Sequence, residues 1–200
     1  MRWMTGALVA VNVAVYLLWH TMRSPAGVRW LAANFLLSTG AVTQGRLQTL
    51  LLAEFSHIDT THLIFNMIGL WTFGRAVERA IGSWRLLYLY VAGGLLASVG
   101  YLVYAALVHS RAPSLGASGA VSAIAVVFAC LYPRAWLVIN FFIPVPAMLA
   151  VVGFLILDIV GVLSPQRDMV AHAAHLGGAL FGGLYWTFWL RPRRRPAYGA

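Results

Sequence analysis

The chain has 200 residues, of which 61% are hydrophobic and only 10% are charged, and its mean hydropathy is +0.80. These values exclude an ordinary soluble domain and predict an integral membrane protein. The formal net charge is +9, but the basic residues are spread along loops and helix ends instead of forming a stripe with interleaved aromatic residues. We therefore expect no nucleic-acid partner. Cys130 is the only cysteine, so no internal disulfide can form.

Six apolar stretches are candidates for membrane-spanning helices, which need about 20 residues to cross a hydrocarbon core of about 30 Å. In chain order they cover residues 4–20, 62–77, 84–108, 117–131, 144–163 and 170–190. The first stretch has no small-residue cleavage site after it and is interpreted as a retained span. The predicted fold is a single all-α membrane domain over residues 1–200, a bundle of six transmembrane helices.

Two segments between the spans are apolar enough to lie in the membrane interface. One is the long connection over residues 21–61, which carries Trp30 and several leucines. The other runs from Ala135 to Ile143 and leads into the fifth span, because Pro144 and Pro146 interrupt an apolar stretch that is too long for one upright helix.

An even number of spans places both termini on one side of the membrane. Most basic residues fall on that side, namely Arg2, Arg75, Arg79, Arg85, Arg134, Arg191, Arg193, Arg194 and Arg195. Cytoplasmic loops are enriched in basic residues, so both termini are predicted to be cytoplasmic, with the basic tail 191–200 against anionic lipid headgroups. Because every basic residue is arginine and none is lysine, we expect a GC-rich genome and a bacterial inner membrane.

Polar residues inside the predicted spans are the candidates for function, because ionisable groups in hydrocarbon are costly and usually face a bundle interior. They are His62, Asn66, Ser118, Asp158, His172 and His175. Spans two, four and six run in the same direction, and each brings its polar group within the first turns, so these groups are expected at a similar depth.

A serine and a histidine at one depth are the minimum for acyl-transfer chemistry, with Ser118 as nucleophile and His175 as base. His62 and Asn66, four residues apart on one helix face, and the backbone N–H of Ser118 offer donors for an oxyanion. Gly116 and Gly119 remove side chains around Ser118. Gly178 and Gly182 form a small-xxx-small pattern that lets spans four and six approach closely.

Each of these residues also has a structural interpretation. Ser118 alone is more often a packing residue, and His62 with Asn66 can be an interhelical hydrogen bond. His172 and His175 with Asp158 could hold a metal ion, although no metal and no cofactor is expected. Asp158 could instead orient His175 as a third triad member, or form a structural pair, or lie at a gate.

Four sequence motifs resemble the rhomboid family of intramembrane serine proteases, from about Leu47 onward. They are FSHIDTTHLIFNMIGLWTFG at 55–74, AVERAIGS at 76–83, GASG at 116–119 and AHLGG at 174–178. The resemblance implies Ser118 as nucleophile, His175 as general base and acid, and His62, Asn66 and Gly116 in the oxyanion and substrate-binding region. His172 is implied to be supporting and resembles mitochondrial and some bacterial members. Asp59 stands where the family often has serine, a departure expected to affect loop bonding only.

The predicted function is that of a serine endopeptidase of the basic six-helix bacterial form. It would cut transmembrane segments of membrane proteins near the outer face, after the substrate enters between spans two and five. Its partners would be transmembrane substrates and the lipid bilayer. The alternatives are a catalytically silent relative that binds transmembrane clients, and a transporter that uses His62, His175 and Asp158.

Overall fold

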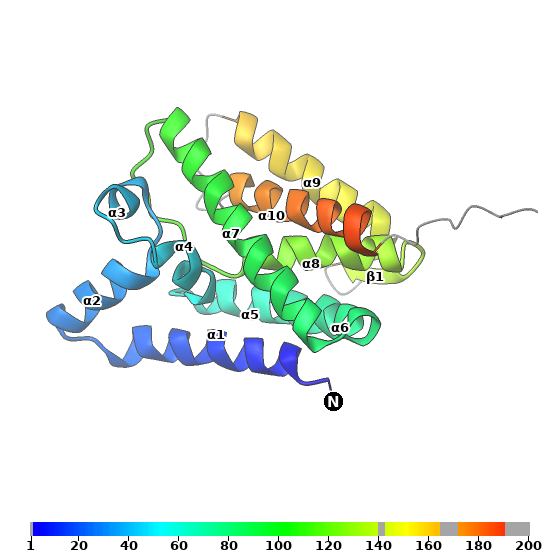
Figure 1. The fold of residues 1–200 in the computed structure, drawn as a ribbon, viewed down its shortest axis with the longest axis horizontal. Helices are drawn as coiled ribbons and strands as arrows, with labels where there is room; N and C mark the ends of the chain where they lie inside the picture. The colour runs from blue at the N-terminus through cyan, green and yellow to red at the C-terminus, as the bar shows by residue number, and fades with distance from the viewer. Residues whose placement is uncertain (1, 140–142, 165–171, 191–200) are drawn as a thin grey trace, which may run out of the picture.

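The computed structural model describes residues 2–139, 143–164 and 172–190, and these residues are almost entirely helical (Figure 1). The long helical segments are α1 (Met4–Thr21), α5 (Thr60–Gly69) continued by the π-helical η2 (Leu70–Gly74) and by α6 (Arg75–Ile81), α7 (Ser83–Leu107), α8 (Ser118–Leu131), α9 (Ala147–Leu163), and α10 (His172–Tyr185) continued by the π-helical η3 (Trp186–Leu190).

Each of the six predicted spans falls on one of these helical segments. By length and composition, α1 and α7 are long and apolar enough to cross a membrane, while α8 and α9 are apolar but shorter. The six-span membrane bundle therefore remains a prediction. The predicted start of the sixth span at Val170 and the basic tail lie outside the described residues.

The connection between α1 and α5 folds into short helices that pack on the rest of the protein. These are α2 (Pro25–Phe35), α3 (Thr39–Thr43), α4 (Thr49–Leu52) and the 3₁₀ turn η1 (Ala53–Phe55). Leu31 and Leu37 are completely buried, whereas Trp30 is half-exposed. Leu37 exchanges two backbone hydrogen bonds with Ser114, of 3.0 and 2.7 Å. This pair ties the connection to the loop that precedes α8.

The segment predicted to lie in the interface before the fifth span contains one strand of a β-hairpin, and its place in the membrane interface stays a prediction. Strand β1 (Trp136–Ile139) pairs antiparallel with β2 (Ile143–Pro146), with Trp136 opposite Pro146. The fifth helix therefore begins at Ala147, and the predicted start at Pro144 is wrong. Proline has no N–H and is unfavourable inside a helix, but a two-stranded hairpin consists of edge strands, which tolerate it.

The centre of the molecule is formed by α7, α8 and α10, which pack on one another, with α1 on one side and α9 on the other (Figure 1). Glycines allow this packing. A Cβ atom on Gly178 would overlap the carbonyl of Gly119, and one on Gly182 would overlap the carbonyl of Ala123. On the α7 side, a Cβ on Gly177 would lie 2.6 Å from the carbonyl oxygen of Leu96. The predicted close approach of these helices is therefore observed, with backbone against backbone.

The first helix is attached by a buried carboxylate. Glu78 accepts hydrogen bonds from the backbone N–H groups of Met4 and Thr5 (2.8 and 3.1 Å), from the Thr5 hydroxyl (2.7 Å) and from the Ser83 hydroxyl (2.6 Å). A negative charge at the first turn of α1 also interacts favourably with the helix dipole. Glu78 thus fixes the start of α1 against the junction of α6 and α7.

The exterior is unusually apolar for a folded chain. On α9, only Ala147 and Asp158 are buried, while Leu157 and Leu163 are 65% and 79% exposed. A water-soluble monomer rarely exposes apolar surface of this extent. The exterior is typical of a protein surrounded by lipid.

The glycine packing gives a matched test within one helix. Gly182→Ala places a methyl group against the Ala123 carbonyl, whereas Gly183 has no atom within 4 Å of the corresponding position. We expect Gly182→Ala to lower the free energy of unfolding by about 1–3 kcal/mol. Gly183→Ala should be neutral or stabilise the helix by up to about 1 kcal/mol. Thermal unfolding of both variants in detergent checks this, and equal melting temperatures would contradict the packing described.

Candidate active site

Ser118 is the first residue of α8 and follows a tight turn at Gly116. Gly116 has φ of +114°, a conformation that side-chain-bearing residues rarely adopt, and its N–H donates to the carbonyl of Ala53 at 2.9 Å. A Cβ atom on Gly116 would lie 2.5 Å from Cε1 of His62. Glycine is therefore required both for the turn and for the His62 ring, which lies directly against it. The first N–H groups of a helix have no partner within the helix, so the start of α8 presents donors beside Ser118.

Asp59 fixes the start of α5 and with it the position of His62. The Asp59 carboxylate accepts a hydrogen bond from the backbone N–H of His62 at 2.8 Å, which is the usual role of an N-cap residue. Serine caps a helix in the same way. The sequence analysis predicted that aspartate in place of serine at position 59 affects only hydrogen bonding in the loop, and this cap is consistent with that prediction.

Asn66 is bonded to His57, a residue that the sequence analysis did not single out. His57 is completely buried, and its Nε2 lies 3.0 Å from Nδ2 of Asn66 and 3.4 Å from the backbone nitrogen of Ala117. Both nitrogens can only donate, so Nε2 accepts and the proton of the ring is on Nδ1. His57 thereby joins α5 to the turn before Ser118. The sequence signal for it was the histidine five residues before His62.

The environment of His57 keeps its ring neutral. The pKa of His57 is lowered to about 4, mainly by burial and then by the nearby His62, while the Phe55 backbone opposes the shift. A neutral ring at physiological pH is what the two accepted hydrogen bonds require. His57 therefore acts as a fixed acceptor that orients Asn66.

His175 lies on α10 and is held by Asp158 from α9. Nδ1 of His175 donates to Oδ1 of Asp158 at 2.9 Å, and Nδ1 of His172 donates to the same oxygen at 2.8 Å. Asp158 and His175 are buried, and the His175 ring lies 5.6 Å from the ring of Phe154. Gly161 makes room for His172, since a Cβ there would overlap the His172 ring. Asp158, His172 and His175, which the sequence predicted to lie at a similar depth in the membrane, are therefore joined by hydrogen bonds through Asp158.

The packing of α8 on α10 brings the chain neighbours of Ser118 and His175 close to each other. Gly119 follows Ser118 and Ala174 precedes His175, and a Cβ on Gly119 would lie 3.4 Å from the Ala174 carbonyl oxygen. His62 is also close enough to His175 for their charges to interact. Between these described residues, no hydrogen bond joins the Ser118 hydroxyl to His175. Catalytic hydrogen bonds are often long without substrate, so the Ser118–His175 pair remains a prediction.

Asp158, His172 and His175 are also the candidate metal ligands in the described part of the chain. Asp158, His172 and His175 each offer one ligand atom, and these atoms lie within 4.8 Å of one another. Their Nδ1–Oδ1 distances of 2.8 and 2.9 Å are those of hydrogen bonds. With zinc–ligand bonds of about 2.0–2.2 Å, two ligand atoms on one tetrahedral ion lie about 3.4 Å apart, so these atoms would have to move away from one another. The arrangement therefore fits a hydrogen-bonded triad better than a metal centre.

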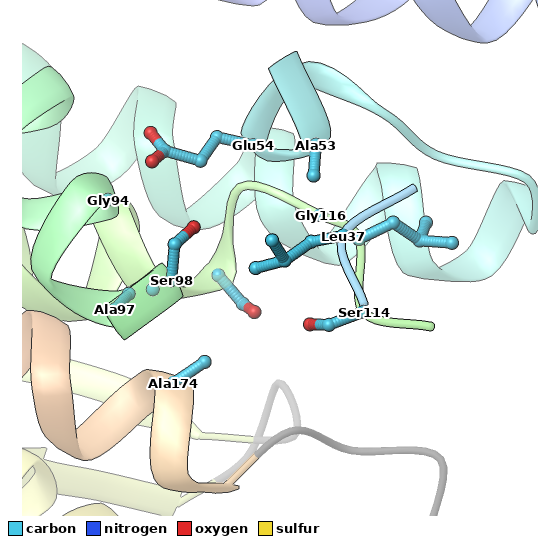
Figure 2. A pocket seen from close by; sticks show the side chains of 12 residues that line it. Leu37, Ala53, Glu54, Gly94, Ala97, Ser98, Ser114, Gly116 and Ala174 are labelled. Carbon is cyan, nitrogen blue, oxygen red and sulfur yellow. The ribbon is translucent and has the colours of Figure 1, made fainter. Parts of the chain in front are cut away.

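A second polar group missed by the sequence analysis, Glu54, lies near Ser118. A cavity of ≈ 20 Å³, enough for about one water molecule, is lined by Glu54, Ser98, Gly116 and Ser118 among others (Figure 2). The Glu54 carboxyl lies where a Cβ on Gly94 would be, and neither of its oxygens has a hydrogen-bond partner among the described residues. Burial raises the pKa of Glu54 to about 9. Glu54 is therefore a neutral acid at pH 7.

Comparison with known proteins identifies the family of this chain. The Rhomboid domain matches residues 44–192, and the chain belongs to the rhomboid family, which confirms the resemblance of its motifs. It is 39% identical to RHOMBOID-like protein 12, mitochondrial, of Arabidopsis thaliana, over 90% of this chain and 56% of the relative. It is 34% identical to Presenilin-associated rhomboid-like protein A, mitochondrial, of Danio rerio, over 89% of this chain and 45% of the relative.

A third relative, Rhomboid-like protein 16, chloroplastic, of Arabidopsis thaliana, is 32% identical over 92% of this chain and 63% of its own length. The chain thus spans about half to just under two thirds of the length of these relatives. Their names place them in mitochondria and chloroplasts. They support a membrane protein of this family, whereas the predicted bacterial inner membrane and the orientation of the termini remain predictions.

The buried carboxyl of Glu54 predicts a pH-dependent stability. Its folded-state pKa of about 9 lies above the ordinary value of 4.5 for a glutamate, so its contribution to the free energy of unfolding is fully present below about pH 4.5 and is lost as the pH rises toward 9. Glu54→Gln removes this loss. We expect the melting temperature of the variant to exceed that of the wild type by an amount that grows between pH 5 and pH 9, reaching several degrees.

The matched control is Glu78→Gln, which changes a carboxylate that accepts four hydrogen bonds from Met4, Thr5 and Ser83. This variant should lower the melting temperature at pH 7. A difference between Glu54→Gln and wild type that stays constant with pH would show that Glu54 is not a buried neutral acid.

Proposed function

We propose that the chain is an intramembrane serine endopeptidase in which Ser118 is the nucleophile and His175 is the general base and acid. The observation that carries the proposal is the contact of α8 with α10 at Gly119 and Ala174, each one residue from a member of the pair. It supports a site that contains the two residue types that acyl transfer needs, in a chain that belongs to the rhomboid family.

The proposed reaction proceeds by two acyl transfers. Ser118 Oγ attacks the scissile carbonyl carbon and forms a C–O bond, its proton passes to Nε2 of His175, and the carbonyl π electrons move to the oxygen. As the C–N bond breaks, His175 returns the proton to the departing amine. Water then attacks the acyl-enzyme with His175 again as base, which frees the second product and restores the Ser118 hydroxyl.

The oxyanion formed in each step needs donors fixed in advance. His62 lies against the turn at Gly116, and the start of α8 offers backbone N–H groups. Asn66 is held by His57 through one hydrogen bond and has a second amide hydrogen to donate. We propose His62, the Ser118 N–H and Asn66 as the stabilising groups. The N–H of Gly116 is bonded to Ala53, so the role of Gly116 is to admit the His62 ring.

The proposed substrates are transmembrane segments of other membrane proteins, which reach the site from the lipid between α5 and α9. A helix hides its carbonyl groups, so the substrate must unwind at the cleavage site, and helix-breaking residues would ease this. We propose an inner (cytoplasmic) membrane with both termini cytoplasmic. No cofactor is part of the proposed reaction.

The test compares wild type with Ser118→Ala and His175→Ala in cleavage of a single-span substrate and in labelling by a fluorophosphonate. Ser122, a buried serine one helical turn after Ser118, gives the matched control. We expect both active-site variants to lose about 10³-fold or more of the cleavage rate, as expected when a member of a catalytic unit is removed. Ser122→Ala should retain cleavage and labelling.

Two outcomes would contradict the proposal. Cleavage that survives in Ser118→Ala would place the chemistry elsewhere. A folded wild type that neither cleaves several substrates nor reacts with the fluorophosphonate would favour the catalytically silent protein that binds transmembrane clients.

A further inference from the structure

The carboxylate of Asp158 contacts Nδ1 of His175, whereas the proposed reaction uses the other ring nitrogen, Nε2. Asp158 is buried and reaches His175 from α9, a different helix, with Nδ1–Oδ1 at 2.9 Å. An ionised carboxylate only accepts hydrogen bonds, so the proton of the neutral His175 ring is on Nδ1. Nε2 is then unprotonated, which is the form that can take a proton from a serine hydroxyl.

We infer that Asp158 is a positioning residue that holds His175 in this tautomer and stabilises the imidazolium formed during the reaction, so that the site works as a triad. The inference rests on the proposed function. In the Ser-His-Asp arrangement the acid has this role without itself taking the proton. Here the acid comes from the helix that follows the β-hairpin, and it reaches the base from outside the α7, α8 and α10 core.

His172 shares the acceptor oxygen and so modifies the effect of Asp158. Its Nδ1 donates to the same Oδ1 at 2.8 Å, and the two rings are 6.3 Å apart. When His172 is protonated, its positive charge opposes a second positive charge on His175. The titratable groups around His175 in the described structure are therefore Asp158 from α9, His172 from its own helix and His62 from α5.

The experiment uses the full chain in proteoliposomes with a single-span substrate. It measures kcat, KM and the pH profile of kcat/KM, together with the rate of fluorophosphonate labelling of Ser118. For Asp158→Asn we expect kcat to fall about 100-fold or more while KM changes less than about threefold. The reason is that His175 loses the carboxylate that orients it, whereas substrate binding is kept. The acidic limb of the profile should move to lower pH, because the neighbouring carboxylate favours the imidazolium.

The His172→Gln variant tests the same hydrogen bonds, but its acidic limb is expected to shift in the opposite direction to that of Asp158→Asn. This variant removes the second donor to Oδ1 of Asp158 and leaves the carboxylate in place for His175 alone, so the acidic limb should move to higher pH. His172 is less buried than Asp158, with side-chain exposures of 20% and 2%, so the variant decides the question if Asp158→Asn does not fold. A purely structural role of Asp158 would move neither limb.

Glu78→Gln serves as the matched carboxylate control, because it removes a buried hydrogen-bonded carboxylate far along the chain from the site. It should lower the melting temperature and leave the acidic limb in place. The inference is overturned if Asp158→Asn keeps kcat within about threefold of wild type with an unchanged acidic limb, or if the limb in His172→Gln stays in place or moves to lower pH.

Failure of the proposed function would look different. Labelling that is absent in the wild type, or that persists in Ser118→Ala, removes the nucleophile itself and with it the inference. An active wild type with labelling at Ser118 and an unaffected Asp158→Asn leaves the protease in place and rejects only the positioning role.

Discussion

The backbone contact between α8 and α10 is the constraint on which the rest of the structure depends. Ser118 and His175 lie on different helices, and ordinary side chains between them would hold those helices about 8–10 Å apart. Gly178 and Gly182 remove that spacing, to the point where a methyl group would meet the carbonyl of Gly119 or of Ala123. The core of this protein is therefore organised by small residues at this interface, and the distance between the helices that carry Ser118 and His175 follows from that close packing.

An apolar exterior makes every internal polar group costly unless it is bonded, and several polar groups of the site are bonded in short local networks. Asp59 caps the helix that carries His62, and His57 joins Asn66 to the turn before Ser118. Asp158 binds two histidines. The hydrogen bonds of His57 and Asp158 connect different segments of the chain, so these polar groups help to set the relative positions of the helices around the site.

Much of the site could be predicted from the sequence because its residues follow the helical repeat. Apolar stretches located the helices to within a few residues, and the distance of His62, Ser118 and His175 from their helix starts indicated a shared layer. The rest depends on lateral neighbours, which periodicity does not show. His57 and Glu54 lie in the irregular connection before α5, where no repeat marks which side chain turns inward.

The hairpin was missed for a different reason. An apolar run containing two prolines fits a disturbed helix and an edge strand equally well until its pairing partner is known. The contact between His175 and Asp158 was only one of several possibilities in the sequence, because depth along a helix fixes one coordinate and leaves the rotation about the axis open. Tertiary packing of α9 supplied that rotation.

Helix α9 is mostly exposed and yet carries Asp158, so a movement of this helix would also move the partner of His175. Its buried residues are Ala147, at the hairpin, and Asp158, near its far end. An outward tilt that made room for another helix would carry the Asp158 carboxylate beyond hydrogen-bond reach of His175, since such bonds weaken within an ångström of stretching. An opening of this size at α9 would thus separate Asp158 from His175, and their hydrogen bond would form again only when the helix returned to its place.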